Sequence, residues 1–344
     1  MGWCGPITRH CLPARRSCSA PASSFSSRSC LERAEAFAPS RAVEKCPLQG
    51  ESMKRLPISL AVAALLASPL AMAKTVDAVA SFSILGDIVK QVGGDHVKVS
   101  TLVGPDGDPH SFEPSPQDGK TLAQADVVFV SGLGLEGWID RLVSASGYKG
   151  QVITASQGIS TRQMEEDGKP ITDPHAWNSM KNGVQYATNV MNALIAADPE
   201  DANYFRQRGA EYIQQLQKLD LWAKTQFAAV PPQKRKVLTS HDAFGYFGQE
   251  YGVTFLAPVG FSTEAEASAS DVAGLIKQIK QEKVNAYFIE NQTDPRLVKQ
   301  IAAATGAKAG GELYPEALSR AGGPAATYEQ AFKHNVDALL SSMK

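Results

Sequence analysis

The feature that most constrains the fold is a long helical stretch lying between two segments that alternate strand and helix patterns. Short apolar runs of strand length recur between helical patterns over residues 76–154, and again over residues 236–313. From residue 200 to residue 229, apolar side chains instead recur three or four residues apart, as in an amphipathic helix, until Pro231 and Pro232 end the run. Alternating strands and helices predict mostly parallel sheets flanked by helices. We therefore predict an α/β protein of two lobes joined by one long, rigid linking helix.

The predicted lobes imply a ligand site between them. We assign an N-terminal lobe to residues 74–181, a helical segment with the linking helix to residues 182–232, and a C-terminal lobe to residues 233–344. In open α/β sheets, ligands bind beyond the carboxyl ends of the strands, where the connecting loops face a crevice. Side chains that follow strands are therefore the candidates for a functional site.

A pattern typical of a secretory signal begins at Met53. Met53 is followed by two basic residues, by an apolar run over residues 56–70, and by the small-x-small pattern of a cleavage site at residues 71–73. We expect a signal peptide over residues 53–73 and a periplasmic protein. The apolar run is shorter than the roughly 20 residues that a membrane-spanning helix needs.

Residues 1–52 differ in composition from the rest of the chain. They are rich in Ser, Arg, Pro and Ala, and they contain all five cysteines of the sequence. We interpret this segment as a disordered, non-native extension that results from a misplaced start codon; a genuine extension or a transit peptide is the alternative. Cleavage after Ala73 would leave a chain without cysteine, which predicts no disulfide, no thiolate metal site and no lipid anchor.

Three of the six histidines share one context, a loop beside a predicted strand. His110 and His175 each follow an Asp-Pro pair, and His241 ends the strand that begins near residue 237. Proline restricts its own backbone and that of the residue before it, so each Asp-Pro-His segment is stiff before a ligand binds. We expect His96, in a turn, and His334, on a solvated helix face, to have no role in binding.

An acidic side chain should complete a site built from these histidines. Glu316 follows the last predicted strand and is our first candidate, while Glu290 at the end of the preceding strand is the alternative. We do not expect Asp294 or Asp242 to be a ligand, and we predict that Asp242 caps the helix behind it. Neutral imidazole suits zinc and similar divalent metals, and three imidazoles with one carboxylate form a typical tetrahedral zinc site.

The mature part of the chain resembles the metal-binding receptors of zinc and manganese ABC importers. The resemblance covers residue 76 to the end and rests on five motifs: ASFSIL at 80–85, GDPHSFEPSP at 107–116, DPHAW at 173–177, SHDAFGYF at 240–247 and LYPEALS at 313–319. It implies that His110, His175, His241 and Glu316 hold the metal, although the family usually has Asp at the last position. Manganese receptors often have Glu where His241 stands, so the resemblance favours Zn²⁺ over Mn²⁺.

The resemblance implies capture of the metal and its delivery to the membrane permease and ATPase of an ABC importer. We expect a monomer that is not an enzyme, and a formal net charge of −1 argues against nucleic-acid binding. The alternatives are a zinc-dependent hydrolase, which needs an open metal position, and a siderophore or haem receptor, which needs a wide cleft with Arg, Tyr and Trp.

Overall fold

The computed structural model describes residues 75–166, 169–263 and 267–344. Within these ranges, no helix is long and apolar enough to cross a membrane. The expected extension over residues 1–52, with its cysteines, and the expected signal peptide over residues 53–73 lie outside the described residues, so they stay predictions, as do the exact domain boundaries.

The N-terminal part of the described chain forms a four-stranded parallel sheet in the order β2-β1-β3-β4. Its strands are β1 (Val76–Phe82), β2 (Val97–Val103), β3 (Val127–Val130) and β4 (Gln151–Thr154), and its helices are α2 (Ser83–Gly93), α3 (Pro116–Ala123) and α4 (Ile139–Ser146), with a 3-10 turn, η1, at Gly94–His96. Every residue of β3 is buried, which explains why this strand reads as a continuous apolar run.

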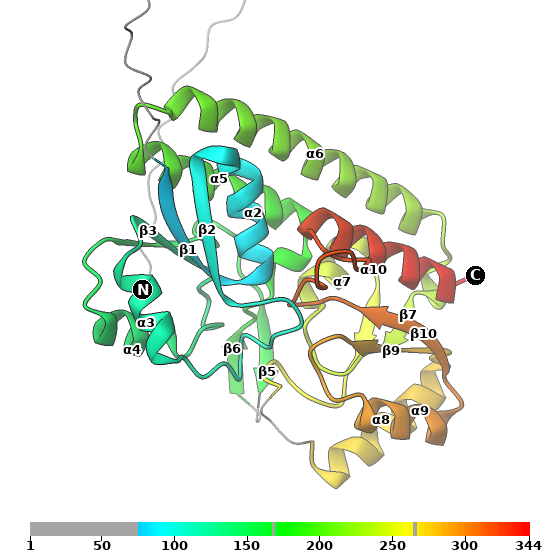
Figure 1. Ribbon diagram of the computed structural model, residues 1–344. Helices are drawn as coiled ribbons and strands as arrows, with labels where there is room; N and C mark the ends of the chain where they lie inside the picture. Colours follow the sequence, from blue (N-terminus) through cyan, green and yellow to red (C-terminus); the bar gives the residue numbers. More distant parts are fainter. Residues whose placement is uncertain (1–74, 167–168, 264–266) are drawn as a thin grey trace, which may run out of the picture. The chain divides into compact units, whose positions relative to one another are not determined.

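The C-terminal part forms a second four-stranded parallel sheet, in the order β10-β9-β7-β8 (Figure 1). Its strands are β7 (Lys236–Leu238), β8 (Thr254–Leu256), β9 (Ala286–Glu290) and β10 (Lys308–Leu313), its helices are α7 (Gly245–Tyr251), α8 (Ala269–Glu282), α9 (Arg296–Thr305) and α10 (Tyr328–Ser342), and a 3-10 turn, η3, spans Pro232–Lys234. Two parallel sheets flanked by helices confirm the predicted fold class.

Two long helices connect the sheets. They are α5 (Met180–Ala197) and α6 (Ala202–Ala228), and they pack against each other along their length. With 27 residues, α6 is about 40 Å long at 1.5 Å per residue. It contacts α2 beside the first sheet and α7 and α10 beside the second (Figure 1). A single helix braced on both lobes is the linking helix that the sequence predicts.

One further element, an antiparallel hairpin before the second histidine motif, was not predicted from the sequence. Strands β5 (Gln163–Glu166) and β6 (Lys169–Thr172) pair with each other and with no other strand among the described residues. Their described side chains are mostly exposed, so the segment lacks the apolar run that marks a buried strand. A 3-10 turn, η2 (Ala176–Asn178), follows the hairpin and begins next to His175.

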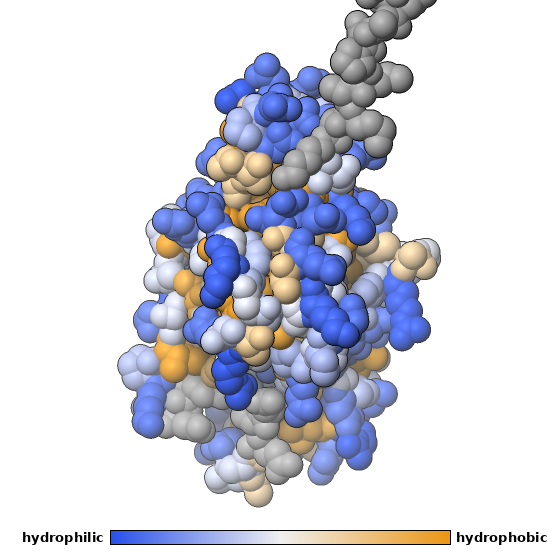
Figure 2. All heavy atoms as spheres, turned by 60° about the vertical axis from the view of Figure 1, so that its left-hand side comes forward, coloured by the Kyte–Doolittle hydropathy of each residue, from blue (hydrophilic) through white to orange (hydrophobic). Residues whose placement is uncertain are grey.

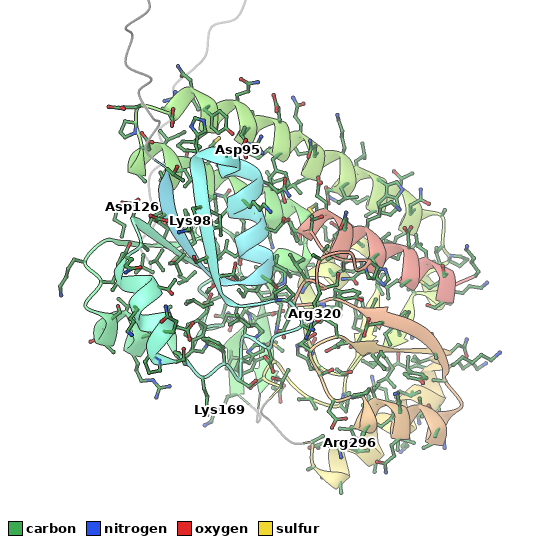
Figure 3. The ribbon with its side chains drawn as sticks, viewed as in Figure 1. Asp95, Lys98, Asp126, Lys169, Arg296 and Arg320 are labelled. Atoms are coloured by element: carbon green, nitrogen blue, oxygen red, sulfur yellow. The ribbon has the colours of Figure 1, made fainter. Side chains whose placement is uncertain are left out.

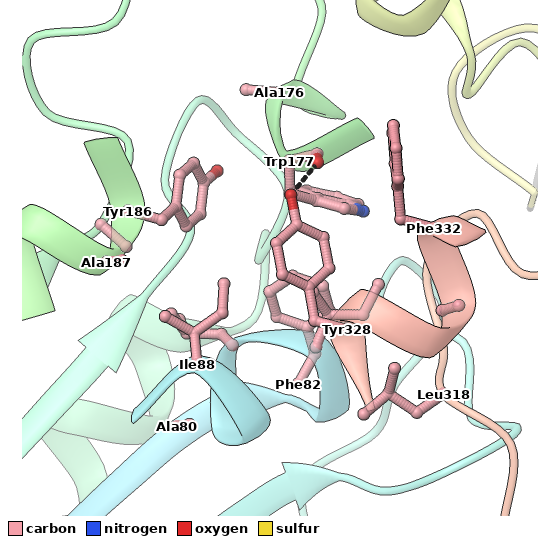
Figure 4. Packing of buried hydrophobic residues seen from close by; sticks show 14 of the residues in the cluster. Ala80, Phe82, Ile88, Ala176, Trp177, Tyr186, Ala187, Leu318, Tyr328 and Phe332 are labelled. Carbon is pink, nitrogen blue, oxygen red and sulfur yellow. Dashed lines mark hydrogen bonds between the residues drawn. The ribbon is translucent and has the colours of Figure 1, made fainter. Parts of the chain in front are cut away.

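One apolar core extends through both lobes. Trp177 of η2 is part of this core and packs against Phe82 of β1, with the ring centroids 4.8 Å apart. The hydroxyl of Tyr328, at the start of α10, donates a hydrogen bond to the backbone carbonyl of Trp177 (Figure 4). Phe332 of α10 belongs to the same cluster. Residues of both sheets therefore share one packed interior, which opposes free movement of the lobes.

The surface is predominantly polar. Figure 2 shows one face on which hydrophilic side chains surround small, scattered apolar patches. Lys98, Lys169 and Arg296 are among the exposed charged side chains (Figure 3). Among the described residues, the large hydrophobic side chains counted as exposed are Val152 and Leu221. Isolated side chains of this kind are normal on a globular protein and do not form an interaction surface.

We predict that the Tyr328→Phe substitution destabilises the protein. It removes the hydroxyl that satisfies the buried carbonyl of Trp177, so the free energy of unfolding should fall by about 1–3 kcal/mol in urea denaturation. Tyr212→Phe is the matched control, because the buried Tyr212 hydroxyl has no hydrogen-bond partner among the described residues. An equal loss of stability in both variants would contradict the role given to the Tyr328 hydrogen bond.

Candidate metal centre

The four side chains expected at the site lie in loops from both lobes. His110 follows β2, and His175 stands between β6 and η2. His241 follows β7, and Glu316 follows β10. Three of the four therefore come after the carboxyl ends of parallel strands, which is where loops of the two lobes can meet.

The structure brings these four side chains together around one carboxylate oxygen. Oε1 of Glu316 lies 2.7 Å from Nε2 of His110, 2.8 Å from Nε2 of His175 and 3.2 Å from Nε2 of His241. One ligand-type atom from each residue falls within 4.8 Å of all the others. The side chains of His175 and Glu316 are completely buried, and those of His110 and His241 are exposed by 3% and 1%. This group of His110, His175, His241 and Glu316 is called the four-residue cluster below.

Asp173 orients His175 from behind. One of its carboxylate oxygens, Oδ1, lies 2.8 Å from the ring Nδ1 and accepts a second hydrogen bond, of 2.9 Å, from the backbone N–H of His175. Its other oxygen pairs with the guanidinium of Arg162, which lies just before the β5–β6 hairpin. A Cβ at Gly245 would lie 1.5 Å from Nη1 of Arg162, so a larger residue there would displace the guanidinium from this position. With Nδ1 beside a carboxylate, Nε2 of His175 is the ring nitrogen that faces the cluster.

Glu290 does the same for His241. Its Oε2 lies 2.5 Å from Nδ1 of His241, and its Oε1 accepts hydrogen bonds from the backbone N–H groups of Ser240 and His241, at 3.0 and 3.3 Å. Glu290 was the alternative to Glu316 as the acidic member of the cluster. The structure instead places it on the far side of the imidazole, where it supports the ring but does not face the other histidines.

Glu316 is held by contacts on its second oxygen and on the preceding residue. Gln292 donates a hydrogen bond of 3.0 Å to Oε2, which leaves Oε1 directed at the imidazoles. The carbonyl of Pro315 accepts hydrogen bonds from the indole of Trp177, at 2.7 Å, and from the amide of Asn178, at 3.2 Å. These donors belong to η2, the turn that follows His175, so the loops of Glu316 and His175 are tied to each other.

Both Asp-Pro-His segments form the same local turn. The Asp108 carboxylate accepts a 2.8 Å hydrogen bond from the backbone N–H of His110, as Asp173 does for His175. The other oxygen of Asp108 accepts a 2.5 Å hydrogen bond from Thr263, a residue of the second lobe. Aspartate side chains favour such turns because they bond to a backbone N–H two residues on. The repeated Asp-Pro pair therefore indicates a turn in which Asp108 and Asp173 bond to the histidine backbone, in addition to the backbone stiffness predicted from proline.

Burial and ion pairing act in opposite directions on the cluster. Burial alone would lower the pKa of His175, but hydrogen bonds from its ring to Asp173 and Glu316 outweigh this effect and raise the pKa to about 9. Burial would likewise lower the pKa of His241, yet the charges of Glu290 and Glu316 raise it well above its usual 6.5. For Glu316, burial would raise the pKa, but the neighbouring His110 and His241 hold it well below its usual value. The neighbouring carboxylates therefore favour the protonated form of His175 and His241, and Glu316 stays ionised.

One nitrogen of the cluster has no hydrogen bond. Nε2 of His241 is buried, and although it lies 3.2 Å from Oε1 of Glu316, it makes no hydrogen bond with any described residue. A buried polar atom without a partner is unfavourable. Three imidazole nitrogens and a carboxylate oxygen that converge in this way are the ligand types of a zinc site, so the residues present fit a divalent metal.

None of the remaining candidates belongs to the four-residue cluster. The helix behind Asp242, α7, begins after Phe244 without a side-chain cap, so the prediction that Asp242 caps it is wrong. Asp294 pairs with Arg296 at the surface. His96 lies in the expected turn, where its Nδ1 is 2.6 Å from Asp201. His334 is not simply solvated, because its ring nitrogen lies 3.0 Å from the carbonyl of Glu312.

Comparisons with known proteins agree with a metal site. The family model described as "Zinc-uptake complex component A periplasmic" matches residues 78–342. The manganese-binding lipoprotein MntA of Bacillus subtilis (strain 168) is 32% identical over 271 residues, which cover 77% of this chain and 89% of the relative. The iron ABC transporter substrate-binding lipoprotein MtsA of Streptococcus pyogenes serotype M1 is 32% identical over 274 residues, covering 77% and 88%.

The solved structures include a similar protein named for zinc. The periplasmic zinc binding protein TroA from Treponema pallidum matches with a TM-score of 0.74 and 30% identity, covering 78% of this chain and 99% of that protein. These names differ in the metal, so they do not bear out the preference for zinc. The word lipoprotein in the names of MntA and MtsA is also at odds with the expected lack of a lipid anchor, an expectation that concerns residues outside the described part.

We predict that the Asp173→Asn substitution weakens metal binding without removing a cluster residue. An amide keeps the shape of Asp173 but loses the charge that orients His175, and changes of this kind typically cost about 10–100-fold in metal affinity. Isothermal titration with Zn²⁺ measures the effect. Asp198→Asn is the control, because Asp198 is also buried but bonds to the backbone of Glu200, away from the cluster. Equal affinities for the two variants would contradict the orienting role of Asp173.

Proposed function

Because the chain belongs to the periplasmic zinc-uptake component A family, we propose that it captures a divalent transition metal outside the cytoplasm, with zinc as the favoured cargo, and delivers it to an ABC importer. The chain is a substrate-binding component and not an enzyme, as its family and its relatives are described. The metal is therefore the transported substrate. We propose His110, His175, His241 and Glu316 as its ligands.

The observation that carries this proposal is the convergence of three imidazole nitrogens on one carboxylate oxygen. Ligand atoms at the corners of a tetrahedron, each about 2.0–2.1 Å from a zinc ion, stand about 3.3 Å apart. Nε2 of His110 lies 3.3 Å from Nε2 of His175, and Nε2 of His241 lies 3.2 Å from Oε1 of Glu316. The two shorter contacts of Glu316, with His110 and His175, need to lengthen only slightly to admit an ion.

The donor set supports zinc over manganese. Three nitrogen donors and one oxygen donor suit zinc, whereas manganese prefers carboxylate, carbonyl and water oxygens, and the general affinity order places zinc above manganese. Carboxylates behind His175 and His241 make these imidazoles better donors. Selectivity in the cell also depends on which metal is available, and relatives are named for manganese, iron and zinc.

The arrangement argues against the two alternatives from the sequence. A zinc hydrolase keeps one metal position open for water, whereas all four donors here come from the protein. A siderophore or haem receptor needs a broad cleft for its ligand, but the cluster is buried among loops of both lobes. A monomer that docks on a permease and its ATPase follows from the proposed role.

The shared core supports a limited movement during capture and release. Helix α6 contacts both lobes, and Trp177 and Tyr328 lie in one interior with residues of both sheets. Wide hinge opening would have to separate these packed groups. We propose that loop and side-chain rearrangement around the cluster carries much of the difference between the loaded and the empty protein.

The ligand assignment predicts loss of metal binding in His241→Ala. Removing one of four donors should lower the zinc affinity by at least about 100-fold. This loss is larger than the one expected when a residue that only orients a ligand, such as Asp173, is replaced. Titration calorimetry with a competing chelator measures zinc and manganese on the wild type and the variant. His334→Ala is the control, since His334 lies outside the cluster. Unchanged 1:1 zinc binding by His241→Ala would refute the assignment, and tighter binding of manganese by the wild type would refute the preference for zinc.

The raised pKa of His175 predicts that proton competition begins at higher pH than for a free imidazole. Metal binding requires the deprotonated ring, so acid favours the empty protein, and the zinc affinity should fall progressively from about pH 9 downwards, where the pKa of His175 lies. Each proton displaced makes the affinity change about tenfold per pH unit. Calorimetry at pH 6, 7 and 8 in buffers of different ionisation enthalpy counts the protons released. A zinc affinity that stays constant between pH 5 and 7.5 would contradict this mechanism.

A further inference from the structure

A cavity of about 680 Å³ adjoins the four-residue cluster. Its wall runs from the exposed side chains of Asp294, Arg296 and Gln300 to the buried Ser240 and His241. Arg296 lies at the start of α9, at the periphery of the second lobe (Figure 3). The cavity therefore connects the outside of this lobe with the imidazole whose Nε2 has no hydrogen bond.

Three oxygen atoms in the cavity wall lack partners. They are Oγ of Ser240, Oε1 of Gln292 and Oγ1 of Thr293, each of them buried and without a hydrogen bond to any described residue. The residue Ser240 is only 7% exposed. Buried polar atoms without partners are unfavourable, so this set of oxygens, the cavity oxygens, is suited to a polar occupant.

Gln292 links the cavity to the cluster. Its amide nitrogen donates to Oε2 of Glu316, while its amide oxygen is one of the cavity oxygens. An occupant bound by this oxygen would lie one side chain away from a residue of the cluster. Ser240, which carries another of the cavity oxygens, is adjacent in the chain to His241 of the cluster.

The charges around the cavity favour a cation. Its lining contains the carboxylates of Asp108 and Asp294, the exposed guanidinium of Arg296, which pairs with Asp294, and the imidazole of His241, which binds a metal in its neutral form. Hydroxyl and amide oxygens also suit a hydrated divalent ion, because they accept hydrogen bonds from the water molecules bound to the ion. At about 30 Å³ per water molecule, the cavity has room for an ion with its complete first shell of water.

The cluster itself cannot accept such an ion. Its four ligand-type atoms lie within 4.8 Å of one another and are buried, so an ion must lose its water before it enters. Resting on the proposed function, we infer that the cavity oxygens form a transient binding site for the hydrated divalent cation, where water is exchanged stepwise for imidazole. The same site is passed in reverse when the metal leaves.

A site that acts only in transit has a distinct kinetic signature. Removing one of its oxygens raises the barrier for entry and for exit equally, so both rate constants fall by the same factor and the equilibrium affinity stays the same. For Thr293→Val, which keeps the shape of the side chain and loses its hydroxyl, we expect both rates to fall about threefold to tenfold, as for the loss of one hydrogen bond. Adding Ser240→Ala should slow both steps further.

Stopped-flow mixing of the full chain with zinc chloride tests this inference. Tryptophan fluorescence reports binding, because the ring of Trp177 lies 5.7 Å from that of His175, and a chase with excess chelator measures release. Thr293→Ser, which keeps the hydroxyl, should retain the wild-type rates. Thr225→Val is the control for the same chemical change, made on the exposed face of α6. Thermal unfolding checks that all variants fold.

The outcomes separate this inference from the proposed function. Equal slowing of entry and exit in Thr293→Val, with wild-type rates in Thr293→Ser and Thr225→Val, supports the transit site. Unchanged rates in Thr293→Val, or a weaker affinity with an unchanged entry rate, overturn the transit site and leave the four ligands in place. A wild-type protein that binds no zinc, manganese or iron overturns the proposed function and the transit site with it.

Discussion

The pairing of one carboxylate oxygen with three imidazoles is the interaction on which the rest of the site depends. Oε1 of Glu316 is buried and stands within 3.2 Å of three Nε2 atoms. A buried carboxylate is stable only when its charge is compensated, and the neighbouring His110 and His241 hold the pKa of Glu316 well below its usual value. A divalent cation can supply the same compensation from the centre of the group. Because a metal ligand must be a neutral imidazole, metal binding at this cluster would release the protons that the carboxylates favour on His175 and His241.

The directions of the rings depend on a second layer of carboxylates. Asp173 binds the Nδ1 atom of His175, and Glu290 binds that of His241, so the Nε2 atoms of these two rings face the centre of the cluster. Both carboxylates also accept backbone N–H groups of the residues that they orient. The ring and the loop of each histidine are therefore positioned by the same side chain, which lowers the entropy that metal binding has to overcome.

The frame around the site limits how it can open. The loops of His175 and Glu316 are joined through Trp177 and the carbonyl of Pro315, and Trp177 is in turn bonded to Tyr328 in the common core. A protein built in this way has little freedom to separate its lobes. A polar cavity that reaches His241 from the second lobe therefore offers a route for the ion that leaves the core packed.

Periodicity and local chemistry made much of this protein predictable. Apolar runs and helical spacing predicted the two parallel sheets and the linking helix, because these patterns reflect which face of each element is buried. The three histidines could be found from their loops beside strands, and Glu316 from its position after β10. The β5–β6 hairpin escaped prediction because its pairing is internal and its side chains are mostly exposed, so no apolar pattern marks it.

Only the tertiary structure shows that Glu316, and not Glu290, lies against the inward Nε2 atoms of the three histidines. Glu290 is the last residue of β9, and Glu316 follows β10, the neighbouring strand of the same sheet, so each is an acidic residue near a carboxyl end. What differs is the nitrogen that each carboxylate meets: Nδ1 of His241 for Glu290, and the inward Nε2 atoms for Glu316. That choice is made by the packing of loops from remote parts of the chain, through contacts such as the one between Trp177 and Pro315. Sequence determined which residues could form the site, and tertiary packing determined which side of each ring they face.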